Sequence, residues 1–254
     1  MERVEKPLDR STPLTFIDPT RKSVVNAETL SDKWYIGVKH AHNTLNATTH
    51  KAVRSGIQPL SNRYRTDLIH NKRIIKQRLY SDTYHARVLS LNKNKYAQVF
   101  LMKPTFVTAY PMEKKSDAGD ALQTYINDWG VNEEGITIDG ALEQIGASSK
   151  FNSVLKKYNI PKHVAEPFHP NQSPVEGTIR EIRKKWFRIM HRRKVPRRLW
   201  DYGIVWVCEI LQHTSNDIYP LHGRTPFEAI TGETPDISAY IDFSFYDWVY
   251  FRSG

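Results

Sequence analysis

The chain has 254 residues, of which 39% are hydrophobic and 11% are aromatic. This length suits one large domain or one domain with a small appendage, and the apolar content can build a core, so wholesale disorder is excluded. No apolar run approaches the roughly 18 residues that span a bilayer, and the first residues lack the apolar stretch of a signal peptide. We therefore expect a soluble protein that is not secreted and has no membrane partner.

Most of the positive charge lies in one segment. The chain holds 37 Lys and Arg against 27 Asp and Glu, a formal net charge of +10. Residues 180–198 alone carry ten basic residues and one acid, which leaves +9 in this segment. A cluster of one sign is typical of a surface that binds a polyanion such as nucleic acid, whereas a solvated helix face normally mixes both signs.

Cysteine usage limits the metal chemistry. Cys208 is the single cysteine, so an intrachain disulfide and a zinc site built on several cysteines are both impossible. We expect no zinc site, and any metal ion would be held by oxygen or imidazole ligands.

The first 80 residues divide into three predicted segments. Residues 1–27 contain prolines among polar residues and show no periodicity, so we expect a flexible leader. Residues 28–57 are predicted to form a small helical subdomain, because apolar side chains recur at spacings of three and four on either side of Gly37. This pair of helices could be a helix-turn-helix or an ordinary helical hairpin. The two helices are expected over residues 27–36 and 38–49. Residues 58–80 are interpreted as a basic linker.

Residues 81–213 carry the pattern of an α/β domain. Runs rich in Val, Tyr and Phe predict three antiparallel strands, and shorter strands then alternate with amphipathic helices. The strands are expected at 84–91, 95–102, 106–112, 133–140 and 161–168. The helices are expected at 116–130, at 148–159, from Pro174 to about Pro196, and at 197–212. This order predicts a mixed five-stranded sheet flanked by helices, with residues 214–254 as a helical C-terminal extension.

Three acids fall where this order would bring them together. Asp82 opens or lies within the first strand, Asp139 ends the fourth strand, and Glu176 lies in the first turn of the long helix. If the elements pack in the usual way, the ends of the first and fourth strands are neighbours in the middle of the sheet, and Glu176 reaches both. Carboxylates without a thiolate or histidine cluster suit Mg²⁺ or Mn²⁺, and two such ions can catalyse phosphoryl transfer. We therefore predict a nuclease or transferase site at Asp82, Asp139 and Glu176, with all three as catalytic metal ligands.

Other acids compete for these roles, because aspartates at strand ends often serve only as turn formers or caps. Asp117 and Asp120 are expected in the first turn of a helix, where they interact favourably with its dipole. Glu166 is a further neighbour in the sequence, and Glu143 stays open as an accessory group.

The long helix joins one acid to the basic segment. At about 100° per residue, one arc of this helix is apolar and the adjoining arc carries Glu176 together with cations. The apolar arc consists of Ile179, Ile182, Trp186, Ile189 and Met190. The adjoining arc consists of Glu176, Arg180, Arg183, Phe187, His191 and Lys194. The residues that we expect to contact DNA are Arg180, Arg183, Lys184, Arg188, His191 and Lys194.

From about Ser81 to the C-terminus, the chain resembles the integrase of copia-type long-terminal-repeat retrotransposons. Asp139 and Glu176 are separated by 36 residues, and Glu176 stands in the segment NQSPVEG, as in the second half of that family's Asp, Asp, Glu triad. Asp82 matches the first acid of the triad in order and in strand position. Residues 223–238, GRTPFEAITGETPDIS, are similar to the family's segment after the catalytic core.

The resemblance implies a ribonuclease H-like core that uses two Mg²⁺ or Mn²⁺ ions to process the 3′ ends of element DNA and to join them to target DNA. Its partners would be double-stranded DNA and further copies of the chain, and its location would be the nucleus. Family members usually carry an N-terminal zinc site made of two His and two Cys. Here no cysteine precedes Cys208 to partner His40, His42, His50 and His70, so we expect that zinc domain to be absent or replaced. Reverse transcriptase and ribonuclease H modules are absent as well, so the chain looks like a piece detached from a polyprotein.

Two other interpretations stay open. The chain could be a catalytically inactive DNA-binding relic of a retroelement polyprotein, in which the helical pair and the basic helix bind DNA and the acids only cap turns. It could instead be a scaffold that binds protein partners, which predicts no salt-sensitive affinity for DNA. Dependence on Mn²⁺ or Mg²⁺ separates the enzyme from the relic.

Overall fold

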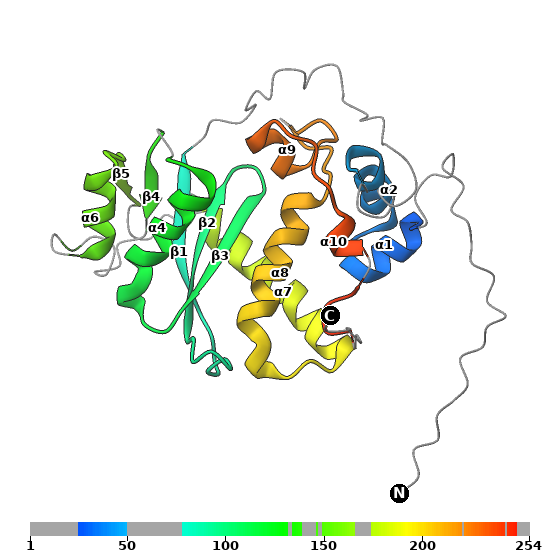
Figure 1. The fold of residues 1–254 in the computed structure, drawn as a ribbon, viewed down its shortest axis with the longest axis horizontal. Helices are drawn as coiled ribbons and strands as arrows, with labels where there is room; N and C mark the ends of the chain where they lie inside the picture. Colours follow the sequence, from blue (N-terminus) through cyan, green and yellow to red (C-terminus); the bar gives the residue numbers. More distant parts are fainter. Residues whose placement is uncertain are drawn as a thin grey trace, which may run out of the picture.

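The computed structural model describes most of the chain. The described residues are 25–49, 78–131, 134–138, 146, 149–165, 174–219, 221–241 and 243–247. The predicted leader lies outside this part of the chain apart from residues 25–27, as does the predicted basic linker apart from residues 78–80. The described residues form a sheet with helices on both faces and a further group of helices beside it (Figure 1).

Five strands form one mixed sheet. They are β1 (Leu79–His85), β2 (Tyr96–Met102), β3 (Phe106–Met112), β4 (Ile136–Ile138) and β5 (Lys162–Val164). The order across the sheet is β3-β2-β1-β4-β5, in which β2 is antiparallel to both β1 and β3 while β1, β4 and β5 run parallel. Strand β1 is central and pairs with β4, so the first and fourth strands are neighbours in the middle of the sheet, as predicted. The predicted fold class, a mixed five-stranded sheet flanked by helices, is confirmed.

The first strand begins and ends earlier than predicted. Its bounds are 79–85 rather than 84–91, and all of its residues pair with β2. Beyond this strand the chain makes a different contact, because Leu91 donates its N–H to the carbonyl of Arg198 at 2.9 Å. The apolar residues that suggested a strand there lie outside the sheet, and the side chain of Leu91 is half exposed. With the corrected bounds, Asp82 lies inside the strand.

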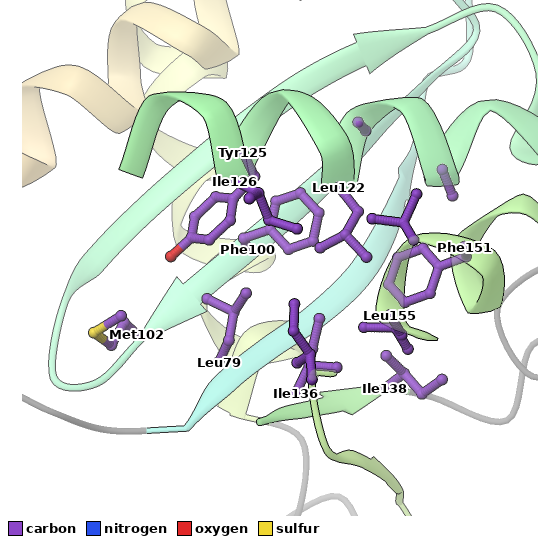
Figure 2. Packing of buried hydrophobic residues seen from close by; sticks show 14 of the residues in the cluster. Leu79, Phe100, Met102, Leu122, Tyr125, Ile126, Ile136, Ile138, Phe151 and Leu155 are labelled. Carbon is purple, nitrogen blue, oxygen red and sulfur yellow. The ribbon is translucent and has the colours of Figure 1, made fainter. Parts of the chain in front are cut away.

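Two helices, α4 (Ala118–Trp129) and α6 (Lys150–Lys157), cover one face of the sheet (Figure 2). Helix α6 begins two residues later than predicted, because Ser149 is its N-cap and the hydroxyl of Ser149 accepts the N–H of Asn152 at 3.2 Å. The helices approach each other closely: a Cβ at Gly119 would lie 2.7 Å from the carbonyl carbon of Lys150. The buried residues of this first core include Leu79, Phe100, Leu122, Ile136, Ile138, Phe151 and Leu155.

The opposite face is covered by α7 (Pro174–Arg193) and α8 (Trp200–His213), which are joined through a short 3-10 helix, η4 (Arg197–Leu199). Helix α7 ends at Arg193, three residues before Pro196, and Lys194 then adopts a left-handed conformation with φ of 53°. Gly203 allows α7 and α8 to pack, since a Cβ there would lie 2.2 Å from the ring of Trp186. The buried residues of this second core include Val99, Val107, Ile182, Trp186, Ile189, Ile204 and Val207.

The predicted pair of helices is present as α1 (Ala27–Trp34) and α2 (Val38–Ala47). The pair packs against the C-terminal extension, which contributes α9 (Pro226–Thr231) and α10 (Ser238–Ile241) (Figure 1). Leu30 and Trp34 are buried with Ile210 of α8 and Ile237 in a third core. The indole N–H of Trp34 donates to the carbonyl of Tyr240 at 2.9 Å, so the two ends of the described chain are held together.

Candidate active site

The side chains of β1 alternate between the two faces of the sheet. Leu79 belongs to the core under α4 and α6, whereas Tyr84 belongs to the core under α7 and α8. Because successive residues of a strand point to opposite faces, Asp82 shares the face of Tyr84. Tyr80, two residues before Asp82, also packs on the second core. The half-buried carboxylate of Asp82 therefore lies on the side of the sheet that α7 covers.

The backbone next to Asp82 fixes its local geometry. The N–H of Thr83 donates to Oδ1 of Asp82 at 2.6 Å. Ser81 pairs in parallel with Ile138, the last residue of β4. Asp139 follows Ile138 in the sequence but lies outside the described residues, as do Glu143 and Glu166. The structure thus confirms that the strands that carry the first acid and precede the second are neighbours.

Glu176 stands in the first turn of α7, and its side chain is exposed. The preceding residue, Val175, is fully buried in the second core, which anchors the start of the helix on the sheet. Helix α7 lies against β1 and β2. Asp82 and Glu176 are therefore on the same side of the sheet, as the interpretation of a shared site requires.

The predicted division of α7 into two faces is observed. Ile182, Trp186 and Ile189 are buried, and Ile179 and Met190 are partly buried against the same core. The residues predicted to contact DNA are all exposed: Arg180, Arg183, Lys184, Arg188, His191 and Lys194. The helix thus turns its apolar arc to the sheet and presents its cationic arc to solvent.

Two of these cations have neighbours that fix their position. The guanidinium of Arg183 lies over the ring of Tyr84, 5.1 Å from the ring centroid, which links α7 to the strand that carries Asp82. Lys184 forms an ion pair with Glu181 at 2.8 Å, and the hydrogen bond and charge of Lys184 lower the pKa of that carboxyl. The acid within the basic segment is therefore already matched by a cation of the same helix.

The C-terminal end of α7 has a different role. Arg192 forms an ion pair with Asp32 of α1 at 2.5 Å and lies over the ring of Tyr35. Arg193 donates to the hydroxyl of Tyr35 at 3.1 Å and to Asp247 at 3.0 Å, and the Tyr35 hydrogen bond raises the pKa of Arg193. Sequence reasoning missed these contacts, because the partners stand far away in the sequence and nothing in their local pattern marks them.

The donor set suits a hard cation. Asp82 and Glu176 offer carboxylate oxygens, and oxygen ligands are those that Mg²⁺ and Mn²⁺ prefer. Within the described residues, no three His, Cys, Asp or Glu side chains form a metal-binding group, and the third predicted ligand, Asp139, lies outside them.

Cys208 is buried in the second core, where burial raises the pKa of its thiol.

No helix of the described part of the chain is long and apolar enough to cross a membrane. No family model matches the sequence, and no curated protein matches it either.

Several solved structures show a distant likeness to the chain. One is a chain in the structure of the simian T-cell lymphotropic virus intasome in complex with PP2A regulatory subunit B56 gamma, with 14% identity and a TM-score of 0.48 over 70% of this chain and 62% of that one. The catalytic core domain of BIV integrase has 15% identity and a TM-score of 0.45, over 61% of this chain and 93% of that one. The HTLV-2 integrase catalytic core domain in complex with magnesium has 18% identity and a TM-score of 0.46, over 61% of this chain and 96% of that one. At such identities and TM-scores, the likeness assigns no activity to this chain.

Proposed function

We propose that this chain is an integrase of the copia retrotransposon type, a metal-dependent polynucleotidyl transferase. It processes the 3′ ends of element DNA and joins them to target DNA. The observation that carries the proposal is the arrangement on one side of the sheet, where Asp82 of the central strand lies on the face that α7 covers and Glu176 stands in the first turn of α7. The same helix continues as a row of exposed cations, which is what an enzyme acting on a DNA backbone needs.

The three acids would hold two Mg²⁺ or Mn²⁺ ions. Such ions activate the attacking oxygen and stabilise the leaving oxygen in phosphoryl transfer. The contribution of the protein is to keep the carboxylates in place: β1 and its Thr83 N–H position Asp82, and the buried Val175 positions the helix start that carries Glu176. Asp139 is assigned by the resemblance and by its place directly after β4.

The cations of α7 would bind DNA phosphates. We assign this role to Arg180, Arg183, Lys184, Arg188, His191 and Lys194, all of which are exposed. Binding to phosphates releases counterions, so the affinity should fall as salt rises. Arg183 would act from a defined position because it rests on the ring of Tyr84. Arg192 and Arg193 have partners within the chain and are not included.

The wider assignments follow from the same resemblance. We propose that the chain acts as a homo-oligomer on double-stranded DNA, both element ends and target, and that it does so in the nucleus.

The decisive experiment is an assay of labelled duplexes that end in candidate element termini, with Mn²⁺ or Mg²⁺ added. We expect nicking near the 3′ end and joined products. Glu176→Gln keeps the size of the side chain but removes its charge, so it should abolish both reactions and leave DNA affinity intact or slightly higher. The matched control is Glu113→Gln, since Glu113 is an exposed acid that follows β3.

The same assay decides among the other interpretations. Salt-sensitive DNA binding without either reaction, for all termini and both ions, would favour the DNA-binding relic. If the chain shows no salt-sensitive affinity for DNA, it is neither an integrase nor a relic of one, and the protein-binding scaffold remains.

A further inference from the structure

One aromatic side chain stands among the cations of α7. Phe187 is 47% exposed, whereas its neighbour Trp186 is 2% exposed. The apolar face of the helix is completed by residues on the opposite side, such as Ile182 and Ile189. The fold therefore gains little from Phe187, and its exposure leaves apolar surface in water.

Phe187 lies on the same line of the helix as Glu176. The two residues are 11 positions apart in α7, close to three whole turns. At about 1.5 Å per residue, the ring stands roughly 16 Å along the helix axis from the acid. That distance corresponds to about five base steps of DNA.

The surroundings of the ring are cationic. Within about one turn of Phe187, on the exposed side of α7, lie Arg183, Lys184, Arg188 and His191. The acid in this stretch, Glu181, is paired with Lys184. A ligand for this surface should combine negative charges with flat apolar faces.

Nucleic acid with unpaired bases has this combination. In a duplex the faces of a base are covered by its neighbours in the stack, so a phenylalanine ring can reach them only where bases are unpaired. Stacking of a base on an aromatic side chain is sequence-tolerant and changes affinity by roughly 5- to 150-fold per base. A protein partner would have to supply acidic groups around an apolar pocket, and nothing in the sequence of α7 selects such a partner over DNA.

We propose that Phe187 stacks on an unpaired base of the DNA that lies along α7. The preferred substrate is then a duplex with unpaired nucleotides near the end that is processed, rather than a fully paired blunt end. This inference rests on the proposed function, in which the cations of α7 bind DNA.

The test compares two probes of equal sequence, a blunt duplex and a duplex with a short unpaired tail. Affinities of the full chain are measured by fluorescence anisotropy over a series of salt concentrations. The variants are Phe187→Ala, Phe187→Trp and a control, Tyr202→Ala, which removes a ring of α8 that is 52% exposed. A tail that contains 2-aminopurine reports stacking directly, because its fluorescence falls when the base stacks.

We expect Phe187→Ala to lose roughly 5- to 150-fold in affinity for the tailed duplex. Its affinity for the blunt duplex and its salt dependence should stay the same. Phe187→Trp should keep the preference for the tail and the quenching of 2-aminopurine, and Tyr202→Ala should behave like the unchanged protein.

Two outcomes would overturn the inference. Equal loss on both probes would mean that the ring supports the helix or a duplex contact, and no loss on either would mean that the ring does not touch DNA, as for a protein-docking side chain. Both outcomes leave the proposed function standing, provided that the unchanged protein binds DNA in a salt-dependent way. Absence of such binding by the unchanged protein would instead remove the proposed function and this inference with it.

Discussion

The two faces of the sheet are each covered by a pair of helices, but they use their charged residues differently. On the side of α4 and α6, two of the cations have partners within the chain. Lys150 pairs with Asp120, and Lys162 donates to Oδ1 of Asn152 at 2.7 Å. On the side of α7 and α8, Arg180 is exposed along the same helix that carries Glu176.

The acidic residues on the two faces also differ in their contacts. On the α4 side, Asp128 accepts the hydroxyl of Tyr110 at 2.8 Å, and burial together with Asp128 raises the pKa of that tyrosine. This acid serves a structural contact. On the α7 side, Asp82 lies on the central strand beside the parallel β4. Both faces are thus packed by a pair of helices, whereas Asp82, Glu176 and the exposed cations of α7 lie on one of them.

The largest expected effect separates the acids of the two faces. Asp82→Asn removes a proposed metal ligand, so 3′ nicking and joining should fall by about a thousandfold or more in the Mn²⁺ assay. Asp120→Asn is the control, since Asp120 is an exposed acid on α4 whose ion pair with Lys150 contributes little. Asp139→Asn should be as inactive as Asp82→Asn, because the ions need all three acids.

A different result would change the assignment of the first acid of the site. If Asp82→Asn stays active while Asp139→Asn and Glu176→Gln are inactive, Asp82 is not part of the site. Asp117 or Glu143 would then be the next residue to test.

The second prediction concerns the packing that fixes the α7 side. Gly203→Ala places a Cβ 2.2 Å from the buried ring of Trp186, so α7 and α8 must separate. We expect the free energy of unfolding to fall by about 3 kcal/mol, the upper part of the range for overpacking. Gly177→Ala is the matched control in α7, because a Cβ there meets nothing within 4 Å.

The control should change stability in the opposite direction. Replacing an exposed helical glycine by alanine favours the helix, so Gly177→Ala should raise the free energy of unfolding by up to about 1 kcal/mol. Denaturant unfolding measures both variants. Equal stability of Gly203→Ala and the unchanged protein would show that the two helices are not in close contact at this point.

Much of the fold follows from local sequence pattern. The helices over 27–34, 118–129 and 174–193 match the predicted periodicity within a few residues, because each buries one face. The bounds predicted for the first strand were wrong because they depend on its pairing with β2, which the alternation of apolar residues up to Leu91 does not reveal. The position of this strand is set by contacts between strands and not by its local sequence.

The candidate site was only partly within reach of sequence reasoning. Helical projection placed Glu176 at the head of a cationic helix, and the order of the strands selected Asp82 and Asp139 as its partners. The resemblance then agreed with this choice. The side of the sheet on which Asp82 lies follows from the register of β1, which only the structure gives. The pairing of Arg192 with Asp32 joins residues 160 positions apart, and no local pattern predicts it.

The third prediction compares cations of the two faces. Replacing Arg180 and Arg188 together by Gln removes two proposed phosphate contacts, so the slope of log affinity against log salt should become shallower by about 1.8. Duplex affinity at moderate salt should fall roughly 10- to 100-fold. Lys156→Gln is the control, because Lys156 is exposed on α6, on the other face. A similar loss for the control would mean that DNA binding depends on net charge and not on α7.

The smallest expected effect concerns the C-terminal end of α7, where Arg192 forms an ion pair with Asp32 of α1. The ion pair between Arg192 and Asp32 is more than half exposed on both sides, with side-chain exposures of 59% and 56%. Exposed pairs of this kind contribute little, so Asp32→Asn should lower the free energy of unfolding by less than about 0.5 kcal/mol. Helix α1 should stay docked, because Leu30 and Trp34 are buried in the third core.

Asp32→Asn should also act on DNA binding in a direction opposite to that of the α7 variants. Without its acidic partner, Arg192 becomes available to a phosphate, so the salt slope should steepen by up to about 0.9 and duplex affinity should rise slightly. Leu30→Ala is the contrasting variant, since loss of a buried leucine should cost about 2–5 kcal/mol. If Asp32→Asn destabilised the protein as much as Leu30→Ala, the ion pair and not the apolar core would hold α1 against the basic helix. The partnered cations at this end of α7 would then be structural residues, and the DNA surface would end before Arg192.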